Sequence, residues 1–223
     1  MELKIEVQNV SKLYPTKGET VVALKDVSLM IQPGEFTAIA GPSGSGKSTL
    51  LNLLGGLDQP TSGKILIGDQ DIARLSGSSL SEIRLHSIGF IFQAYNLIPV
   101  LSVLENVEYV MLLQGLDKGL RRKKCSDILA EVGLSQHLDR RPAELSGGQQ
   151  QRVAVARAIV SEPALVLADE PTANLDSGTA GDLLDLMANL NRERKITFVF
   201  SSHDSLVLSR ARRVVKLHDG KIQ

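Results

Sequence analysis

The chain has 223 residues, enough for one sizeable core or for a core with a small inserted subdomain. Its 25 Lys and Arg residues balance 25 Asp and Glu residues, so no strong overall field attracts nucleic acid, and we expect no nucleic-acid partner. A single cysteine excludes an internal disulfide and is typical of a reducing compartment. No run of about 18 apolar residues is present to cross a membrane. Any membrane association is therefore expected to come through a partner.

The N-terminal part of the chain predicts mainly strands. Alternating apolar residues at 3–10 predict one strand, and residues 21–31 predict two more short strands. The continuous apolar run FTAIA at 36–40 is typical of a parallel strand that is buried on both faces. Leucines within 47–57 predict a helix with a wide apolar face. Further strands are predicted at 64–72 and 88–93.

The rest of the chain predicts a helical segment and then a return to alternating strands and helices. Apolar residues have helical spacing in 102–115, 122–132 and 147–161. Strands at 164–169, 196–201 and 213–220 then alternate with a helix around 178–192 and a second, short helix. This order predicts one α/β core, residues 1–93 and 162–223, that carries a helical subdomain at 94–161.

A glycine-rich segment joins the buried strand at 36–40 to the first helix. GPSGSGKS at 41–48 matches the phosphate-binding pattern G-x-x-x-x-G-K-[ST], between the strand and the helix that the pattern requires. Its glycines allow backbone N–H groups to form a nest for anionic oxygens. Lys47 would neutralise phosphate charge, and the Ser48 hydroxyl would bind Mg²⁺. The segment therefore predicts nucleotide binding.

Two carboxylates end the apolar strand at 164–169. Because the carboxyl ends of parallel strands meet at one edge of a sheet, we expect Asp169 and Glu170 beside the phosphate-binding loop. Asp169 would approach Mg²⁺ through water. Glu170 would orient or deprotonate the water that attacks the γ-phosphate. The alternative interpretation is that either acid only caps a helix.

Polar residues close two further strands that end at the same edge. Gln93 ends the strand at 88–93 and would contact Mg²⁺ or the attacking water, with a strand-end cap as the alternative. His203 follows the strand at 196–201, where we expect it beside the phosphates, with a solvated loop histidine as the alternative.

Taken in order, these segments resemble the ABC-type ATPases over essentially the whole chain. The motifs are GPSGSGKS, Gln93, LSGGQ at 145–149, ALVLADEPT at 164–172, NLD at 174–176 and His203. The resemblance implies a P-loop NTPase α/β core with a mixed, largely parallel sheet, an N-terminal antiparallel β subdomain and an inserted α-helical subdomain. It also implies binding and hydrolysis of ATP with Mg²⁺.

The resemblance further implies a role for each matching residue. Tyr14 would stack on adenine, Gln93 would couple the site to a partner, Asp176 would lie in the loop that crosses to the opposite subunit, and His203 would contact the γ-phosphate. The catalytic residues would be Lys47, Gln93, Glu170 and His203, and the metal-binding residues Ser48, Gln93 and Asp169. The nucleotide-binding residues would be Tyr14, Gly41, Pro42, Ser43, Gly44, Ser45, Gly46, Lys47, Ser48, Thr49, Ser146, Gly147, Gly148, Gln149 and Asp176.

The LSGGQ segment offers a second phosphate cradle in the same chain. Ser146 supplies a hydroxyl, Gly147 and Gly148 leave backbone N–H groups bare, and a predicted helix aims its positive end there. In the family two subunits pack head to tail, with ATP between the P-loop of one and this signature of the other. Closing that seam excludes water and strengthens the electrostatics at the reacting phosphate. The resemblance therefore implies a homodimer around two ATP.

Longer segments, 50–67, 89–108 and 145–158, look similar to the lipoprotein-releasing and macrolide-export ATPases, which drive mechanical motion in a membrane subunit. We therefore expect the chain at the cytoplasmic face of the membrane, held by an integral membrane subunit that docks near Gln93–Glu105. Tyr95 and Leu97 are the expected exposed contacts. One alternative is a cell-division ATPase that signals through a membrane partner without transport. A second is a soluble ATP-dependent binding module without membrane partners.

Overall fold

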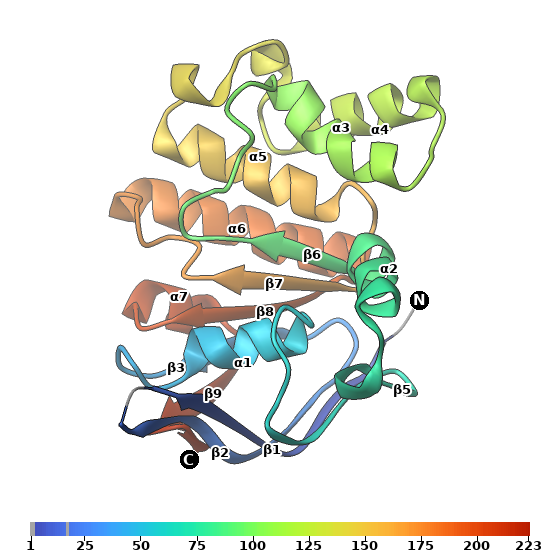
Figure 1. Ribbon diagram of the computed structural model, residues 1–223. Helices are drawn as coiled ribbons and strands as arrows, with labels where there is room; N and C mark the ends of the chain where they lie inside the picture. Colours follow the sequence, from blue (N-terminus) through green and yellow to red (C-terminus); the bar gives the residue numbers. More distant parts are fainter. Residues whose placement is uncertain (1–2, 17) are drawn as a thin grey trace.

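Two β-sheets form the frame of the protein in the computed structural model, which describes residues 3–16 and 18–223 (Figure 1). A six-stranded sheet has the order β10-β9-β3-β8-β7-β6, and all its strands are parallel except β10. A four-stranded antiparallel sheet has the order β2-β1-β4-β5. The strands are β1 (Ile5–Pro15), β2 (Thr20–Ile31), β3 (Phe36–Ala40), β4 (Ser62–Ile67), β5 (Gln70–Asp71), β6 (Ile88–Ile91), β7 (Leu165–Asp169), β8 (Thr197–Ser202), β9 (Arg213–His218) and β10 (Lys221–Ile222).

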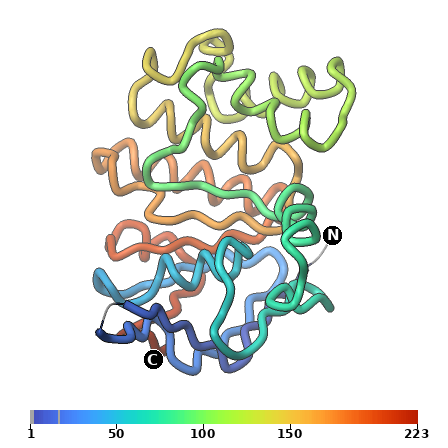
Figure 2. The backbone as a smooth tube through the Cα atoms, viewed as in Figure 1, coloured from blue at the N-terminus to red at the C-terminus, as the bar shows by residue number. Residues whose placement is uncertain are grey.

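Helices cover the six-stranded sheet and build a separate layer beyond it, which the tube view in Figure 2 shows most simply. They are α1 (Lys47–Leu54), α2 (Gly77–Ser87), α3 (Val103–Leu113), α4 (Lys118–Glu131), α5 (Gly147–Ile159), α6 (Ser177–Arg194) and α7 (Ser205–Arg210). One buried apolar cluster lies between the sheet and α3–α6, and a second lies between the sheet, α1 and the antiparallel sheet. Every residue of β3 and β8 is buried, as expected for central parallel strands covered on both faces. The predicted fold class is confirmed.

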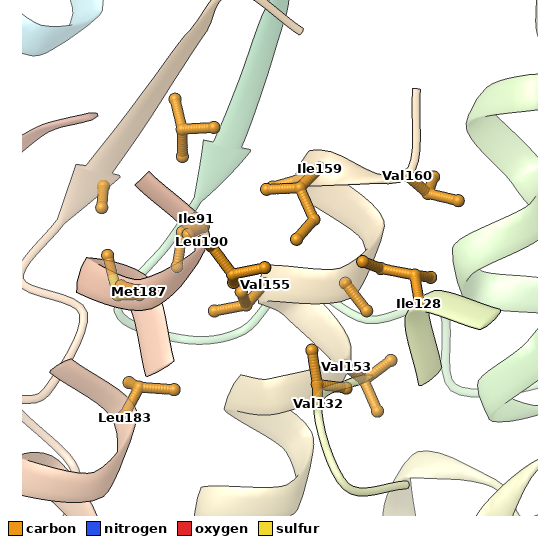
Figure 3. Packing of buried hydrophobic residues seen from close by; sticks show 14 of the residues in the cluster. Ile91, Ile128, Val132, Val153, Val155, Ile159, Val160, Leu183, Met187 and Leu190 are labelled. Carbon is orange, nitrogen blue, oxygen red and sulfur yellow. The ribbon is translucent and has the colours of Figure 1, made fainter. Parts of the chain in front are cut away.

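Helix α5 joins the outer helices to the core. In Figure 3, Ile128 and Val132 of the α4 region lie on one side of α5, and Leu183 and Met187 of α6 lie on the other. The apolar side chains of α5 therefore pack on both sides, which fixes the helix relative to the sheet edge. Because α5 belongs to both packings, the division into a core and a subdomain at 94–161 stays a prediction.

Two local expectations differ from the structure, and one helix was not expected. Residues 21–31 form one strand, β2, instead of two; Asp26 has a φ of 53°, and the pairing of β1 with β2 shifts register between Val10 and Lys12. The strand predicted at 64–72 is divided by a turn at Gly68, whose φ of 60° suits glycine. Helix α2 was not predicted, because Leu80 is its only buried residue and leaves little apolar periodicity to detect.

Two observations bear on the expected absence of a membrane span and on the lone cysteine. Across residues 3–16 and 18–223, no helix combines the length and the apolar character that crossing a bilayer needs. Cys125 on α4 is fully buried, and burial raises the pKa of its thiol to about 12. The thiol therefore stays protonated at neutral pH and serves the packing of α4.

Candidate functional site

The glycine-rich loop 41–46 connects β3 to α1 and curls around the side chain of Lys47. The Lys47 ammonium donates hydrogen bonds to the carbonyls of Gly41 at 2.8 Å and Pro42 at 3.0 Å. Gly46 has a φ of 102°, and a Cβ there would lie 2.5 Å from the carbonyl oxygen of Ala23, so only glycine fits. The loop thus has the tight backbone path that a phosphate nest needs.

A cleft of about 430 Å³ opens beside this loop at the carboxyl edge of the sheet. It brings together most of the residues expected to bind phosphates and to catalyse: Ser43, Gly44, Gly46, Lys47, Ser48, Thr49, Gln93, Glu170 and His203. The lining is completed by Val21, Val22, Ala23 and Ala173, none of which was expected from the sequence. The valines come from the exposed part of β2, where strand alternation alone did not distinguish a ligand surface from an ordinary solvated face.

Asp169 does not line the cleft, but it contacts the first turn of α1 through Ser48, which does. The Ser48 hydroxyl donates to Asp169 Oδ1 at 3.0 Å. Among residues 3–16 and 18–223, no cluster of three or more His, Cys, Asp or Glu side chains is arranged to hold a metal ion. A hydroxyl and one carboxylate still fit Mg²⁺, because this ion is usually held by one or two carboxylates together with substrate phosphates and water.

Glu170 lies within reach of both a cation and an imidazole. Its Oε1 atom is 3.0 Å from His203 Nδ1 and 3.9 Å from Lys47 Nζ. Its backbone has a φ of 45°, a strained conformation for a residue other than glycine. With Nδ1 protonated, His203 donates to the carboxylate and orients it toward the cleft. This arrangement is suited to holding a water molecule for attack on a phosphate.

Tyr14 lies outside the cleft lining. Its hydroxyl donates to Asp58 at 2.7 Å, and the Lys12 ammonium lies 4.8 Å from its ring centroid. Burial raises the pKa of the phenol, and the hydrogen bond to Asp58 raises it further. One ring face is thus engaged by a cation within the chain, and stacking of Tyr14 on adenine stays a prediction.

The signature residues form the first turn of α5 and do not line the cleft. Ser146 Oγ accepts from the Gln149 N–H at 3.3 Å, and the Ser146 N–H donates to Gln149 Oε1 at 3.0 Å, which makes a capping box. Gln149 Nε2 also lies 3.1 Å from His137 Nε2, so both ends of this amide are engaged within the chain. In Figure 1, α5 and α1 both begin on the left of the view, with β7 and β8 between them.

Neighbouring side chains of the same chain leave no room for a Cβ at either signature glycine, Gly147 or Gly148. A Cβ at Gly147 would lie 2.8 Å from the Tyr95 hydroxyl, and a Cβ at Gly148 would lie 2.4 Å from Thr179 Cγ2. Thr179 in turn donates its N–H and its hydroxyl to Asp176, the N-cap of α6, and these bonds lower the pKa of that carboxyl. The start of α5 therefore touches the segment after Gln93 and the first turn of α6.

The segment that follows Gln93 is tied to its neighbours through its backbone. Asn174 donates to the Gln93 carbonyl at 2.9 Å. Arg157 of α5 donates to the carbonyls of Tyr95 at 2.8 Å and Asn96 at 2.6 Å, both of which have positive φ. The fork of the guanidinium thus fixes a strained turn to the helix that carries the signature.

The expected docking segment 93–105 is only partly the exposed apolar surface. Leu97 packs against the core and Tyr95 is half-buried, whereas Val100 is 71% exposed. A groove of about 410 Å³ lies next to this segment, between α2, β6, α3 and α5, and Phe90, Phe92 and Val110 are among its apolar lining. Of residues 93–105, Asn96 alone lines this groove. Tyr95 and Leu97 are thus less exposed than expected, because the sequence could not show how far each apolar side chain is covered, and their contact with a partner stays a prediction.

The comparisons with a family model and with known proteins agree on one family. The ABC transporter family model matches residues 24–173. The chain is similar to the macrolide export ATP-binding/permease protein MacB of Hyphomonas neptunium, with 48% identity over 98% of the chain and 34% of that protein. It is also similar to the ABC transporter ATP-binding protein YtrE of Bacillus subtilis, with 46% identity over 98% of the chain and 96% of that protein. The chain thus spans about a third of the length of the MacB relatives.

Solved structures agree with this comparison. The dimeric structure of the ATP-binding cassette MJ0796 bound to ADP and Pi is 42% identical, with a TM-score of 0.91, and the match covers 98% of this chain and 96% of that one. A second similar structure is cbiO1 from Clostridium perfringens, with 31% identity, a TM-score of 0.88 and cover of 98% of this chain and 86% of that one.

Proposed function

Because the chain belongs to the ABC transporter family, we propose that it binds and hydrolyses ATP to drive a membrane-spanning permease. The observation that carries this proposal is the cleft that groups Lys47, Ser48, Glu170 and His203 beside the phosphate-binding loop. A nucleotide held there has its triphosphate against the loop, within reach of a cation and a carboxylate.

The proposed chemistry assigns one task to each group. Lys47 stabilises the charge that develops on the transferred phosphoryl group, and the loop N–H groups hold its oxygens. Glu170 orients and deprotonates the attacking water, with His203 holding the carboxylate in place. Ser48 and Asp169, with Gln93 nearby, would hold Mg²⁺, which supplies charge neutralisation at the β- and γ-phosphates.

The second cradle, Ser146–Gln149, is proposed to act on the nucleotide of another copy of the chain. It lies outside the cleft of its own chain, at the N-terminus of α5, where the helix dipole favours an anion. MJ0796 was solved as a dimer with ADP and Pi, which supports the same arrangement here. Two copies packed head to tail would bury two ATP, each between one loop and one signature.

The permease is proposed to dock on the apolar groove beside α3. Besides the groove lining, α3 exposes Tyr109, Leu112 and Leu113 to 42%, 49% and 57%, which is much apolar surface for one short helix. Docking there would place the chain at the cytoplasmic face of a membrane without a span of its own. Of the expected outputs, mechanical export or lipoprotein release is favoured over cell-division signalling, because several similar proteins are named for macrolide export.

The proposal is tested by Glu170→Gln, which keeps the size of the side chain and removes its basicity. Turnover should fall by about 10²–10⁴-fold, as for loss of a general base. Light scattering after gel filtration with Mg²⁺ and ATP should then find the mass of two chains, returning to one when ATP is removed. A wild-type chain that hydrolyses ATP while both proteins stay monomeric would refute the dimer.

A further inference from the structure

Ser201 is a buried hydroxyl residue at the carboxyl end of β8 to which neither the sequence motifs nor the proposed mechanism assigns a task. Its side chain is fully buried, and it follows the apolar residues Phe198, Val199 and Phe200 in a central strand. A hydroxyl at such a position is unfavourable unless hydrogen bonds replace those it loses to water. The partners of Ser201 therefore indicate why a hydroxyl is there.

Both hydrogen bonds of Ser201 go to the two acidic residues at the end of β7, Asp169 and Glu170. Its Oγ donates to Asp169 Oδ1 at 2.5 Å and accepts from the backbone N–H of Glu170 at 3.1 Å. The register of the parallel pair sets Asp169 opposite Ser201, so the two side chains share one face of the sheet. One hydroxyl uses its single proton on the carboxylate and a lone pair on the neighbouring N–H.

The bond to Asp169 fixes the orientation of this carboxylate. Ser48 also donates to Oδ1, at 3.0 Å, so hydroxyls from α1 and β8 hold the same oxygen. Two donors on one oxygen set the rotation of the carboxylate about its last bond. Oriented carboxylates bind metal ions better than free ones, because the ordering is completed before the ion arrives.

The bond to Glu170 supports a strained backbone. Glu170 has a φ of 45°, which an L-residue adopts only when its surroundings hold it there. The Ser201 hydroxyl accepts the N–H of this same residue, so it stabilises the turn that aims the Glu170 side chain at His203 and Lys47.

We propose that Ser201 is a positioning residue that orients both carboxylates of the site, Asp169 toward Mg²⁺ and Glu170 toward the attacking water. This inference rests on the proposed ATPase function. Without the hydroxyl, the carboxylate of Asp169 loses its shortest donor and the N–H of Glu170 loses its partner, so both the metal and the water are held less well.

The test compares Ser201→Ala and Ser201→Thr with the wild-type chain. Removal of the hydroxyl should lower kcat about 10–100-fold and raise the Mg²⁺ concentration for half-maximal turnover, the usual effect of losing such a support. A fluorescent ATP analogue should bind equally well in EDTA, but the gain in affinity on adding Mg²⁺ should shrink. Ser201→Thr, which keeps the hydroxyl, should recover most of the kcat and the Mg²⁺ dependence.

Ser202→Ala is the matched control. Ser202 is equally buried, but its hydroxyl accepts from the Asp204 N–H at 3.0 Å and touches neither carboxylate. This variant should lower the Tm to a similar degree and leave the Mg²⁺ dependence unchanged. If Ser201→Ala keeps the wild-type kcat and Mg²⁺ dependence, or if Ser202→Ala shifts both as strongly, the positioning role is overturned. A wild-type chain without ATPase activity would instead overturn the proposed function.

Discussion

Individual side chains orient the carboxylates of Asp169 and Glu170. Some of the residues of this site could be predicted from the sequence and others could not. Lys47 and Ser48 close a phosphate-binding pattern, and Asp169 and Glu170 end an apolar strand. Their proximity could therefore be predicted: Lys47, Ser48 and Glu170 line one cleft, and Asp169 accepts a hydrogen bond from Ser48. Ser201 could not be predicted, because its contacts depend on the register of β7 against β8. A hydroxyl in an apolar strand has no periodicity that would mark such a role.

Gly147 lies so close to Tyr95 that we expect substitutions at the two positions to have coupled effects on stability. Gly147→Ala would push a methyl group against the Tyr95 hydroxyl and should lower the free energy of unfolding by about 1–2 kcal/mol. In a Tyr95→Phe background the hydroxyl is gone, and the same alanine should be nearly neutral. Urea unfolding of the four proteins of this cycle measures the coupling.

Gly181→Ala is the control for this cycle. Nothing lies within 4 Å of a Cβ at Gly181, in the interior of α6, so alanine there should stabilise by about 0.5–1 kcal/mol in both backgrounds. Equal effects of Gly147→Ala with and without the Tyr95 hydroxyl would show that the two residues do not touch.

Helices with strong apolar periodicity could be predicted well from the sequence. Which of their apolar side chains remain exposed could not. The spacing that predicted a helix at 147–161 corresponds to α5, which is packed on both sides. The sequence also predicted α3 from its apolar residues, but which of them remain uncovered depends on how α4 and α5 pack around it. The exposed residues of α3 therefore add to the docking surface that had been expected at 93–105.

Leu113 is the residue of α3 that tests this surface. Val110 lines the groove, and Gln114 donates to the Leu85 carbonyl of α2, so Leu113, three residues after Val110, lies on the same side of the helix. Leu113→Glu places a charge in an apolar interface and should weaken binding to membranes of the source organism at least about tenfold. Co-sedimentation with those membranes measures this, and the ratio of membrane-stimulated to basal ATPase rates should fall with it.

Leu120→Glu is the matched control, because Leu120 is a leucine of comparable exposure on α4. Equal co-sedimentation of the two variants with the membranes would mean that the groove beside α3 is not the docking site.

At the scale of the whole molecule, the two proposed phosphate cradles, the loop 41–46 and the signature Ser146–Gln149, do not share one cleft within a chain. Their order could be predicted from the motifs, and the start of α5 as a helix N-terminus is confirmed. What the sequence could not give is their separation, because it depends on how the helices and strands between them pack. Because of that separation, the loop of one chain does not face the signature of the same chain, and a second copy would supply the signature that faces it.

Mixing two inactive variants tests this shared site most directly. Lys47→Ala removes the cation of the loop, and Ser146→Asp keeps a helix N-cap but points a negative charge at the phosphates of the opposite copy. Each alone should turn over ATP at about a hundredth of the wild-type rate or less. In an equimolar mixture half of the dimers have one intact site, so up to about a quarter of the wild-type rate should return. A mixture no faster than the mean of its two inactive parents would contradict the head-to-tail dimer.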